Sequence, residues 1–180
     1  HFHVPLQSGS NKVLRLMRRR YLRELYADRV RRIKEQMPHC CIGVDVIVGF
    51  PGESEADFLD TYHFINDLDV SYLHVFPYSE RANTPAAEMT PVVPKAERAR
   101  RSEMLHILSD KKRRKFYEDN IGRAAYALFE TQDEENEMTG FTENYIKVTA
   151  RFDPLAINDI RKVRLTGISP RGFMEVSEVN

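Results

Sequence analysis

A nearly continuous apolar run from Ile42 to Phe50 is the strongest hydrophobic pattern in this chain. Such a run is typical of a parallel strand that is covered on both faces. A Gly/Pro turn follows it, and Ser54 with Asp57 then forms the pattern of a capping box. The sequence therefore predicts a buried strand that leads through a tight turn into a helix.

Asp45 is the one charged residue inside this run. Burying a carboxylate is costly unless another group pairs with it, so we expect Asp45 to have a partner. Because side chains alternate along a strand, Asp45 shares a face with Gly43, Ile47 and Gly49, and this face is the expected ligand side. The opposite face, which we expect to pack against helices, carries Val44, Val46, Val48 and Phe50.

Strand and helix signals precede the central run. Residues 2–6 are a strand candidate, and the turn at residues 7–11 supplies a helix N-cap. Apolar residues then recur at helical spacing and predict a helix that Pro38 ends. These residues are Leu14, Met17, Tyr21, Leu25, Val30, Ile33 and Met37.

After the central strand, the pattern predicts a helix at about residues 55–68, a strand at 72–76, a loop at 79–94 and a basic helix at 95–119. The first of these helices presents Phe58, Leu59, Tyr62 and Ile65 as its inner face. Alternating strands and helices indicate an α/β fold with parallel strands, either an open sheet or part of a barrel. Ligands of such folds bind beyond the carboxyl ends of the strands, here at residues 7–10, 49–53 and 77–84.

From residue 122 onward the pattern changes to short alternating segments. Five such segments predict a small all-β antiparallel barrel, a shape that often binds oligonucleotides. The segments are 125–130, 138–142, 146–150, 160–168 and 173–179. The acidic run 133–135 is the expected tip of a hairpin. We therefore expect two domains, residues 1–118 and 119–180.

With 180 residues, 42% of them hydrophobic, the chain can bury a real core. It contains no apolar run of membrane-spanning length and no leader, so we expect a cytoplasmic protein without membrane contact. The abrupt opening at residues 1–6 resembles the interior of a fold, which predicts a start further upstream. Cys40 and Cys41 are adjacent, a spacing that suits neither a disulfide nor a metal site and predicts reduced thiols.

The net charge of zero conceals alternating basic and acidic blocks. Basic helical stretches at residues 15–32 and 111–115 are candidates to face phosphate. Solvated helix faces explain each stretch equally well.

Several short blocks stand out in order along the chain: Pro5–Ser10, Met17–Tyr21, Asp45–Glu53, and Phe76–Arg81 with Thr84–Ala87. Together these blocks resemble the radical S-adenosylmethionine (SAM) methylthiotransferases. The resemblance implies the second half of a radical SAM TIM-like barrel, followed by an OB-like TRAM barrel around Gly140–Tyr145. Residues 43–45 and 74–79 are most similar to the branch that modifies threonylcarbamoyladenosine at position 37 of tRNA.

The resemblance implies that SAM on one 4Fe-4S cluster generates a deoxyadenosyl radical, while a second 4Fe-4S cluster supplies sulfur and another SAM supplies the methyl group. Cluster iron needs thiolate ligands, which the family provides in a C-x-x-x-C-x-x-C loop and three further cysteines. This sequence has neither set. We therefore expect a C-terminal fragment that lacks its N-terminal half and is inactive alone, and we assign it no catalytic residue or metal ligand.

By the same resemblance, Gln7 and Asp45 would bind the ribose of SAM and Arg19 its carboxylate. Ile47 would pack against the adenine, and the backbone around Phe76 would meet the adenine edge. Each assignment has an ordinary structural alternative: a turn cap for Gln7, a solvated side chain for Arg19 and core packing for Ile47.

The candidate tRNA contacts are basic residues of the long helix and of the barrel: Lys111, Lys112, Arg113, Arg114, Lys147, Arg151, Arg161, Lys162 and Arg164. Aromatic candidates to stack on an unpaired base are Phe141, Tyr145, Phe152 and Phe173. Two other substrates stay open, namely isopentenyladenosine in tRNA and an aspartate of a ribosomal protein. A non-catalytic RNA-binding module is the alternative of a different class.

Overall fold

The computed structural model describes residues 1–132 and 136–179, so the expected hairpin tip at 133–135 lies outside the described residues. The chain divides into two compact units. One unit is Phe2–Lys112, and the other begins at Arg113 and includes His1. None of the described helices is long and apolar enough to cross a membrane.

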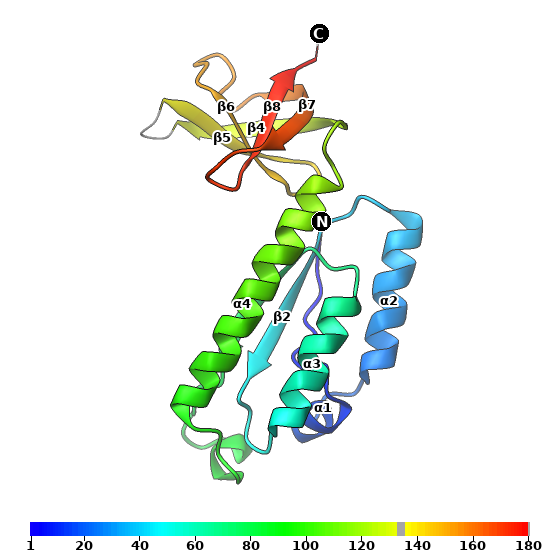
Figure 1. Ribbon diagram of the computed structural model, residues 1–180, viewed down its shortest axis with the longest axis vertical. Helices are drawn as coiled ribbons and strands as arrows, with labels where there is room; N and C mark the ends of the chain where they lie inside the picture. The colour runs from blue at the N-terminus through cyan, green and yellow to red at the C-terminus, as the bar shows by residue number, and fades with distance from the viewer. Residues whose placement is uncertain (133–135, 180) are drawn as a thin grey trace. The chain divides into compact units, whose positions relative to one another are not determined.

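The first unit is a parallel α/β unit, as the sequence predicts. Its sheet has the order β1 (Phe2–His3), β2 (Ile42–Val48), β3 (Tyr72–Pro77), and neighbouring strands run parallel. Its helices are α1 (Asn11–Leu16), α2 (Arg23–Gln36), α3 (Glu55–Asp67) and α4 (Lys95–Glu118), of which α4 continues into the second unit. Figure 1 shows α2, α3 and α4 around β2. A short 3-10 helix, η1 (Pro85–Glu88), lies in the loop before α4.

The valine face of β2 forms the core, which confirms the predicted packing side. Val44, Val46 and Val48 are at most 1% exposed and share one cluster with buried side chains of α2, α3 and α4. The predicted inner face of α3 is wrong at Leu59, which is 37% exposed. Thr61 is buried on that helix instead, because its hydroxyl binds the backbone N–H of Gly9 in the turn after β1.

The predicted single helix before Pro38 is wrong, because α1 and α2 are separate helices. α1 ends in a Schellman motif, in which Arg18 adopts a left-handed φ of 55°. The N–H of Arg18 donates to the Arg15 carbonyl, and that of Arg19 donates to the Leu14 carbonyl. The helical spacing of apolar residues continues across this break, so periodicity alone does not reveal it. The second helix also exposes Leu25.

The predicted capping box at the start of α3 is confirmed, and its acidic member Asp57 gathers several donors. Ser54 donates to the carboxylate from its hydroxyl and its backbone N–H, Ser10 donates at 3.0 Å and Lys12 at 2.6 Å. Burial alone would raise the pKa of Asp57, but these hydrogen bonds outweigh it and lower the pKa to about 2.

We expect the stabilisation from Asp57 to be lost in acid. A lowered pKa stabilises the fold fully above the ordinary value of 3.8, and the contribution disappears as the pH falls towards about 2. Asp57→Asn should therefore lower the free energy of unfolding by about 2 kcal/mol at neutral pH, and should change it little near pH 2. Urea unfolding across this range measures the difference, and a pH-independent difference would contradict this role.

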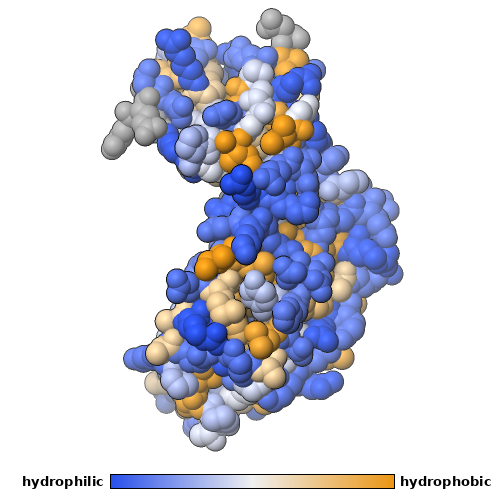
Figure 2. All heavy atoms as spheres, viewed as in Figure 1, coloured by the Kyte–Doolittle hydropathy of each residue, from blue (hydrophilic) through white to orange (hydrophobic). Residues whose placement is uncertain are grey.

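The second unit contains a closed barrel of five strands. These are β4 (Ala124–Gln132), β5 (Glu137–Thr142), β6 (Lys147–Arg151), β7 (Ile160–Ile168) and β8 (Met174–Glu178), in the barrel order β4-β5-β6-β8-β7. The expectation of an entirely antiparallel barrel is wrong, because β6 and β8 pair in parallel through Val148 and Met174. β7 lies between them in the sequence and closes the barrel against β4. Figure 2 shows hydrophobic side chains among the hydrophilic ones on the visible surface.

Candidate functional site

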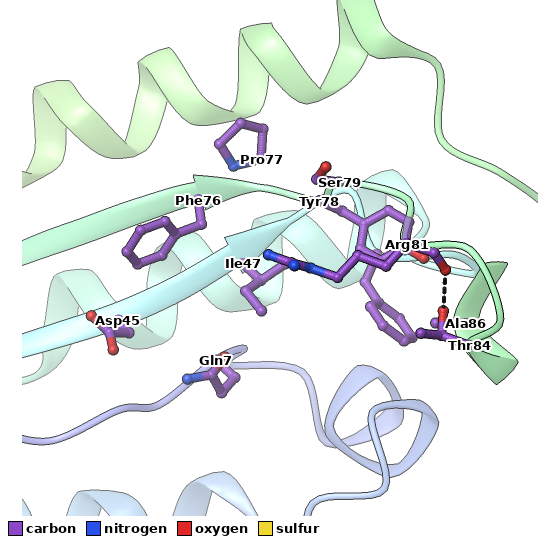
Figure 3. A pocket seen from close by; sticks show the side chains of 11 residues that line it. Gln7, Asp45, Ile47, Phe76, Pro77, Tyr78, Ser79, Arg81, Thr84 and Ala86 are labelled. Atoms are coloured by element: carbon purple, nitrogen blue, oxygen red, sulfur yellow. Dashed lines mark hydrogen bonds between the residues drawn. The ribbon is translucent and has the colours of Figure 1, made fainter.

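A cleft of about 460 Å³ lies over the carboxyl-terminal halves of β2 and β3 and the loop that follows β3. The turn after β1, the two strands and the loop after β3 all contribute to it, and Figure 3 shows their side chains projecting into one space. Among its lining residues are Gln7, Asp45, Ile47, Phe50, Phe76 and Arg81. This is the position at which ligands bind in parallel α/β folds.

Gln7 is held in a strained conformation on the floor of the cleft. Its φ is 72°, in the left-handed region that residues other than glycine seldom adopt. Its N–H donates to the Asp45 carbonyl at 2.8 Å, and its carbonyl accepts from Ile47 at 2.9 Å, so the strand β2 fixes it. The residue is only 8% exposed, and its side-chain amide, which lines the cleft, has no hydrogen-bond partner among the described residues. An amide that faces a cleft without a protein partner is available to a polar ligand.

Asp45 has the partner that its position requires. His3 Nε2 lies 2.8 Å from Asp45 Oδ1, and the Asp45 side chain is 23% exposed towards the cleft. The carboxylate is therefore paired and partly open rather than fully buried. The second oxygen, Oδ2, has no partner in the described part of the chain.

The apolar lining comes from Ile47, Phe76 and Phe50. Ile47 and Phe76 are register partners on β2 and β3, and Phe76 is 52% exposed. The assignment of Phe50 to the helix-packing face is wrong, because Phe50 lines the cleft. Gly49, with a φ of 74°, ends the strand alternation just before it. An apolar surface of this kind suits one face of a planar ring.

Arg19 lines an adjoining hollow of about 580 Å³, which shares Ile47, Phe50, Thr84 and Ala86 with the cleft. The Schellman motif at the end of α1 places it there. The structure thus brings Gln7, Asp45, Ile47 and Phe76 together in one cleft, with Arg19 beside them.

Sequence reasoning missed Arg98 of α4, which holds the outer wall of the cleft. Its guanidinium donates to the carbonyls of Tyr78 at 2.7 Å and Val93 at 2.8 Å, and pairs with Glu80 at 2.5 Å. It is only 4% exposed. These contacts tie both ends of the loop that carries Arg81 and Thr84. In the sequence, Arg98 is one of many basic residues of a helix, and nothing there distinguishes it from a solvated arginine.

The two cysteines do not fit an iron–sulfur cluster. Both are buried next to β2, and burial raises the pKa of Cys41 to about 11, so its thiol stays protonated at neutral pH. Cluster iron binds thiolates. The described residues also contain no group of three or more metal-ligating side chains.

The basic residues assigned to RNA occupy several separate places. Lys162 and Arg164 point outward from β7, and Lys162 is the register partner of the exposed Tyr126 on β4. Arg161 points to the other side, where it pairs with Asp159 and donates to the Leu155 carbonyl.

The other candidates lie elsewhere. Lys147 on β6 stacks over the ring of Phe173 at 4.2 Å. Lys112 donates to the carbonyls of Asn66 and Leu68 at the end of α3. Lys111, Arg113 and Arg114 are exposed on α4, and Arg151 is exposed at the end of β6. Of the aromatic candidates, Phe141 and Tyr145 stack on each other at 4.9 Å, and Phe152 is partly buried just after β6.

Comparison with known proteins decides the family. The sequence model of the radical SAM superfamily matches residues 1–65. The threonylcarbamoyladenosine tRNA methylthiotransferase MtaB of Aquifex aeolicus (strain VF5) is 48% identical over 148 residues, which cover 82% of this chain and 35% of that protein. The protein of the same name from Bacillus subtilis (strain 168) is 42% identical over 169 residues, which cover 92% of this chain and 38% of that protein. The chain belongs to the radical SAM methylthiotransferase family.

A relative named for a different substrate also matches this chain. The tRNA-2-methylthio-N(6)-dimethylallyladenosine synthase of Bacillus pumilus (strain SAFR-032) is 36% identical over 168 residues, covering 92% of this chain and 33% of that protein. The chain thus spans 33% to 38% of the length of these three relatives. The resemblance of the four sequence blocks is confirmed.

The residues of the cleft fit SAM, the cofactor that the superfamily implies. The unpaired amide of Gln7 and the free Oδ2 of Asp45 provide a donor and acceptors for a diol, and Ile47 with Phe76 provides an apolar surface for a base. The exposed guanidinium of Arg19 is of the right sign for a carboxylate.

Proposed function

We propose that the cleft is the nucleoside-binding part of the SAM site of a tRNA methylthiotransferase. The observation that carries this proposal is Gln7, a strained and buried residue whose side-chain amide meets no protein partner in the described chain. Backbone strain persists at functional sites, and an amide without a protein partner is open to a ligand.

In this proposal each residue has one task. Gln7 and Asp45 hydrogen-bond the two ribose hydroxyls, and Arg19 pairs with the carboxylate of the methionine part. Ile47 and Phe76 hold the adenine and exclude water from it. SAM supplies a deoxyadenosyl radical and a methyl group in this chemistry, and the residues of this chain bind and orient it.

In the whole protein, we expect Asp45→Asn to weaken SAM binding by about 1 to 3 kcal/mol, the range for a lost hydrogen bond to a charged group. Isothermal titration measures the change. Asp60→Asn, on the exposed face of α3 and away from the cleft, is the matched control and should bind as the wild type does. Unchanged affinity for SAM in a folded Asp45→Asn variant would show that Asp45 has a structural role and does not bind SAM.

We further propose threonylcarbamoyladenosine of tRNA as the substrate. Two relatives named for that substrate are 42% and 48% identical and a third is 37% identical, whereas five relatives named as dimethylallyladenosine synthases are 34% to 36% identical. Mass spectrometry of tRNA nucleosides from a strain that lacks the whole gene tests this. Loss of the methylthio group from threonylcarbamoyladenosine supports the proposal, whereas loss from dimethylallyladenosine assigns the other substrate.

We propose that the barrel is a TRAM domain with an OB-like topology and that it contacts the tRNA. Lys162 and Arg164 on β7 support this, because they point outward from the strand and Lys162 is the register partner of the exposed Tyr126, which combines cations with a ring for stacking.

If this face binds tRNA, affinity should fall steeply with salt concentration. Reversing the charge of Lys162 and Arg164 should flatten the slope of log affinity against log salt by about 0.7 to 0.9 for each phosphate contact that is lost. Arg161→Glu is the neighbouring control and should change the slope less, since Asp159 already pairs with the charge of Arg161, whereas Arg164 donates to a neutral carbonyl, that of Gly122. Equal slopes in all variants would place the RNA contact elsewhere, and so would equal tRNA binding by a chain that lacks the barrel.

A further inference from the structure

A row of ring side chains lies on the cleft side of the sheet, below the proposed SAM site. His3 on β1 lies beside His74 on β3, with ring centroids 5.3 Å apart. The edge of Tyr72 in turn packs on His74 at 5.1 Å. These rings come from the two outer strands and meet over β2, where Gly43 and Asp45 are their register partners.

Gly43 makes this arrangement possible. A Cβ at residue 43 would lie 2.4 Å from the hydroxyl oxygen of Tyr72, closer than any real contact allows. Without a side chain at Gly43, Tyr72 crosses over β2 and supports His74. The His3 ring therefore packs against His74 and also contacts the carboxylate of Asp45.

Among the described residues, the His3 imidazole is the one side chain that pairs with the Asp45 carboxylate. His3 Nε2 contacts Oδ1 at 2.8 Å, while Oδ2 has no partner among the described residues. A carboxylate on a strand has several staggered χ1 rotamers, and the contact with His3 selects one of them. In that rotamer the carboxylate lines the cleft.

We propose that His3 is a positioning residue that holds Asp45 in the rotamer required to bind the ligand of the cleft. This inference rests on the proposed function for the ligand, a ribose diol. His3 itself acts through Asp45. Tyr72 and His74 act one step further away, because they restrict the His3 ring.

The first test needs no ligand. Three-bond scalar couplings report the χ1 populations of Asp45 in the 180-residue chain. The wild type should show one dominant rotamer, and His3→Leu should show averaging. His3→Gln, whose amide nitrogen reaches about as far as Nε2, should restore the single rotamer, whereas the shorter His3→Asn should not. A single unchanged rotamer in folded His3→Leu or His3→Asn would overturn the inference.

The second test uses SAM. His3→Leu should weaken SAM binding roughly tenfold, the effect of a hydrogen bond made by a charged group, and His3→Gln should recover most of it. In an Asp45→Asn background, His3→Leu should have no further effect, because both changes act on one contact. His63→Leu, on the exposed face of α3, is the control and should leave binding unchanged.

The two tests separate the inference from the proposed function. If the wild type shows no binding of SAM, the proposed function fails, and the rotamer measurement still decides the role of His3. If SAM binds and additive losses are seen for His3 and Asp45, His3 contributes independently and the positioning role is wrong.

Discussion

Arg101→Leu should destabilise the first unit by about 3 to 5 kcal/mol, because it leaves a buried carboxylate without its cation. Arg101 Nη1 lies 2.5 Å from Glu53 Oε1, and the two side chains are 5% and 2% exposed. The same guanidinium also pairs with Glu97 and Glu55, which are more exposed. Burial raises the pKa of Glu53. The N–H of Gly49, at 2.9 Å, and the Arg101 guanidinium favour the charged form and partly offset this effect. Without Arg101, the Gly49 N–H is the one donor to Glu53 that we find among the described residues.

Urea unfolding followed by circular dichroism measures this loss. Arg100→Leu is the matched control, since Arg100 is the adjacent arginine and is 45% exposed. Its ion pairs among the described residues join the partly exposed Glu55 and Glu97, so its loss should cost less than about 1 kcal/mol. Combining Arg101→Leu with Glu53→Met should recover much of the loss, because the unpaired charge is removed. If the two single arginine variants lose equal stability, the buried pair does not have this role.

Gly140→Ala should destabilise the barrel by about 3 kcal/mol, at the upper end for an overpacked site. A Cβ at residue 140 would lie 1.9 Å from the backbone oxygen of Leu128 on the neighbouring strand β4. Backbone atoms of a paired strand cannot move aside as the end of a long side chain can. The addition of one methyl group therefore has to separate β4 from β5 near the bulge between Phe129 and Thr131.

Gly167→Ala on β7 is the control, because a Cβ there meets only the Glu175 side chain at an ordinary 3.6 Å. Amide hydrogen exchange reads the two units separately. Gly140→Ala should speed exchange in the barrel strands and leave β2 and the buried faces of the helices unchanged. Slow exchange retained throughout the barrel would show that β4 and β5 accommodate the methyl group.

The parallel unit could be predicted from the sequence because its strongest signals are local. The apolar run of β2, the N-caps at Ser10 and Ser54 and the alternation of strands with helices each depend on neighbouring residues alone. The break between α1 and α2 could not be predicted, because Arg18 enters the left-handed region without a glycine to mark it. The exposure of Leu59 likewise depends on the turn after β1, where Gly9 packs against Thr61.

The residues of the candidate site also fall into two groups, those that the sequence predicts and those that it does not. The ligand face of Asp45 and Ile47 follows from alternation along one strand, and Gln7 and Arg19 came from a family resemblance. His3 as the partner of Asp45, and Arg98 as the anchor of the outer wall, depend on contacts between elements far apart in the sequence. The parallel pairing of β6 with β8 is also such a contact, and alternating short segments contain no information about it.

The side-chain amide of Gln7 tests the central claim most directly. In the 180-residue chain, titration with SAM should shift the Gln7 side-chain NH₂ resonances saturably, together with the backbone amides of Ile47 and Phe76 around the cleft. Gln7→Ala should weaken binding, and resonances of the barrel should stay in place. Saturable shifts that spare Gln7 and the cleft, or no shifts at all, would contradict the assignment of this cleft to SAM.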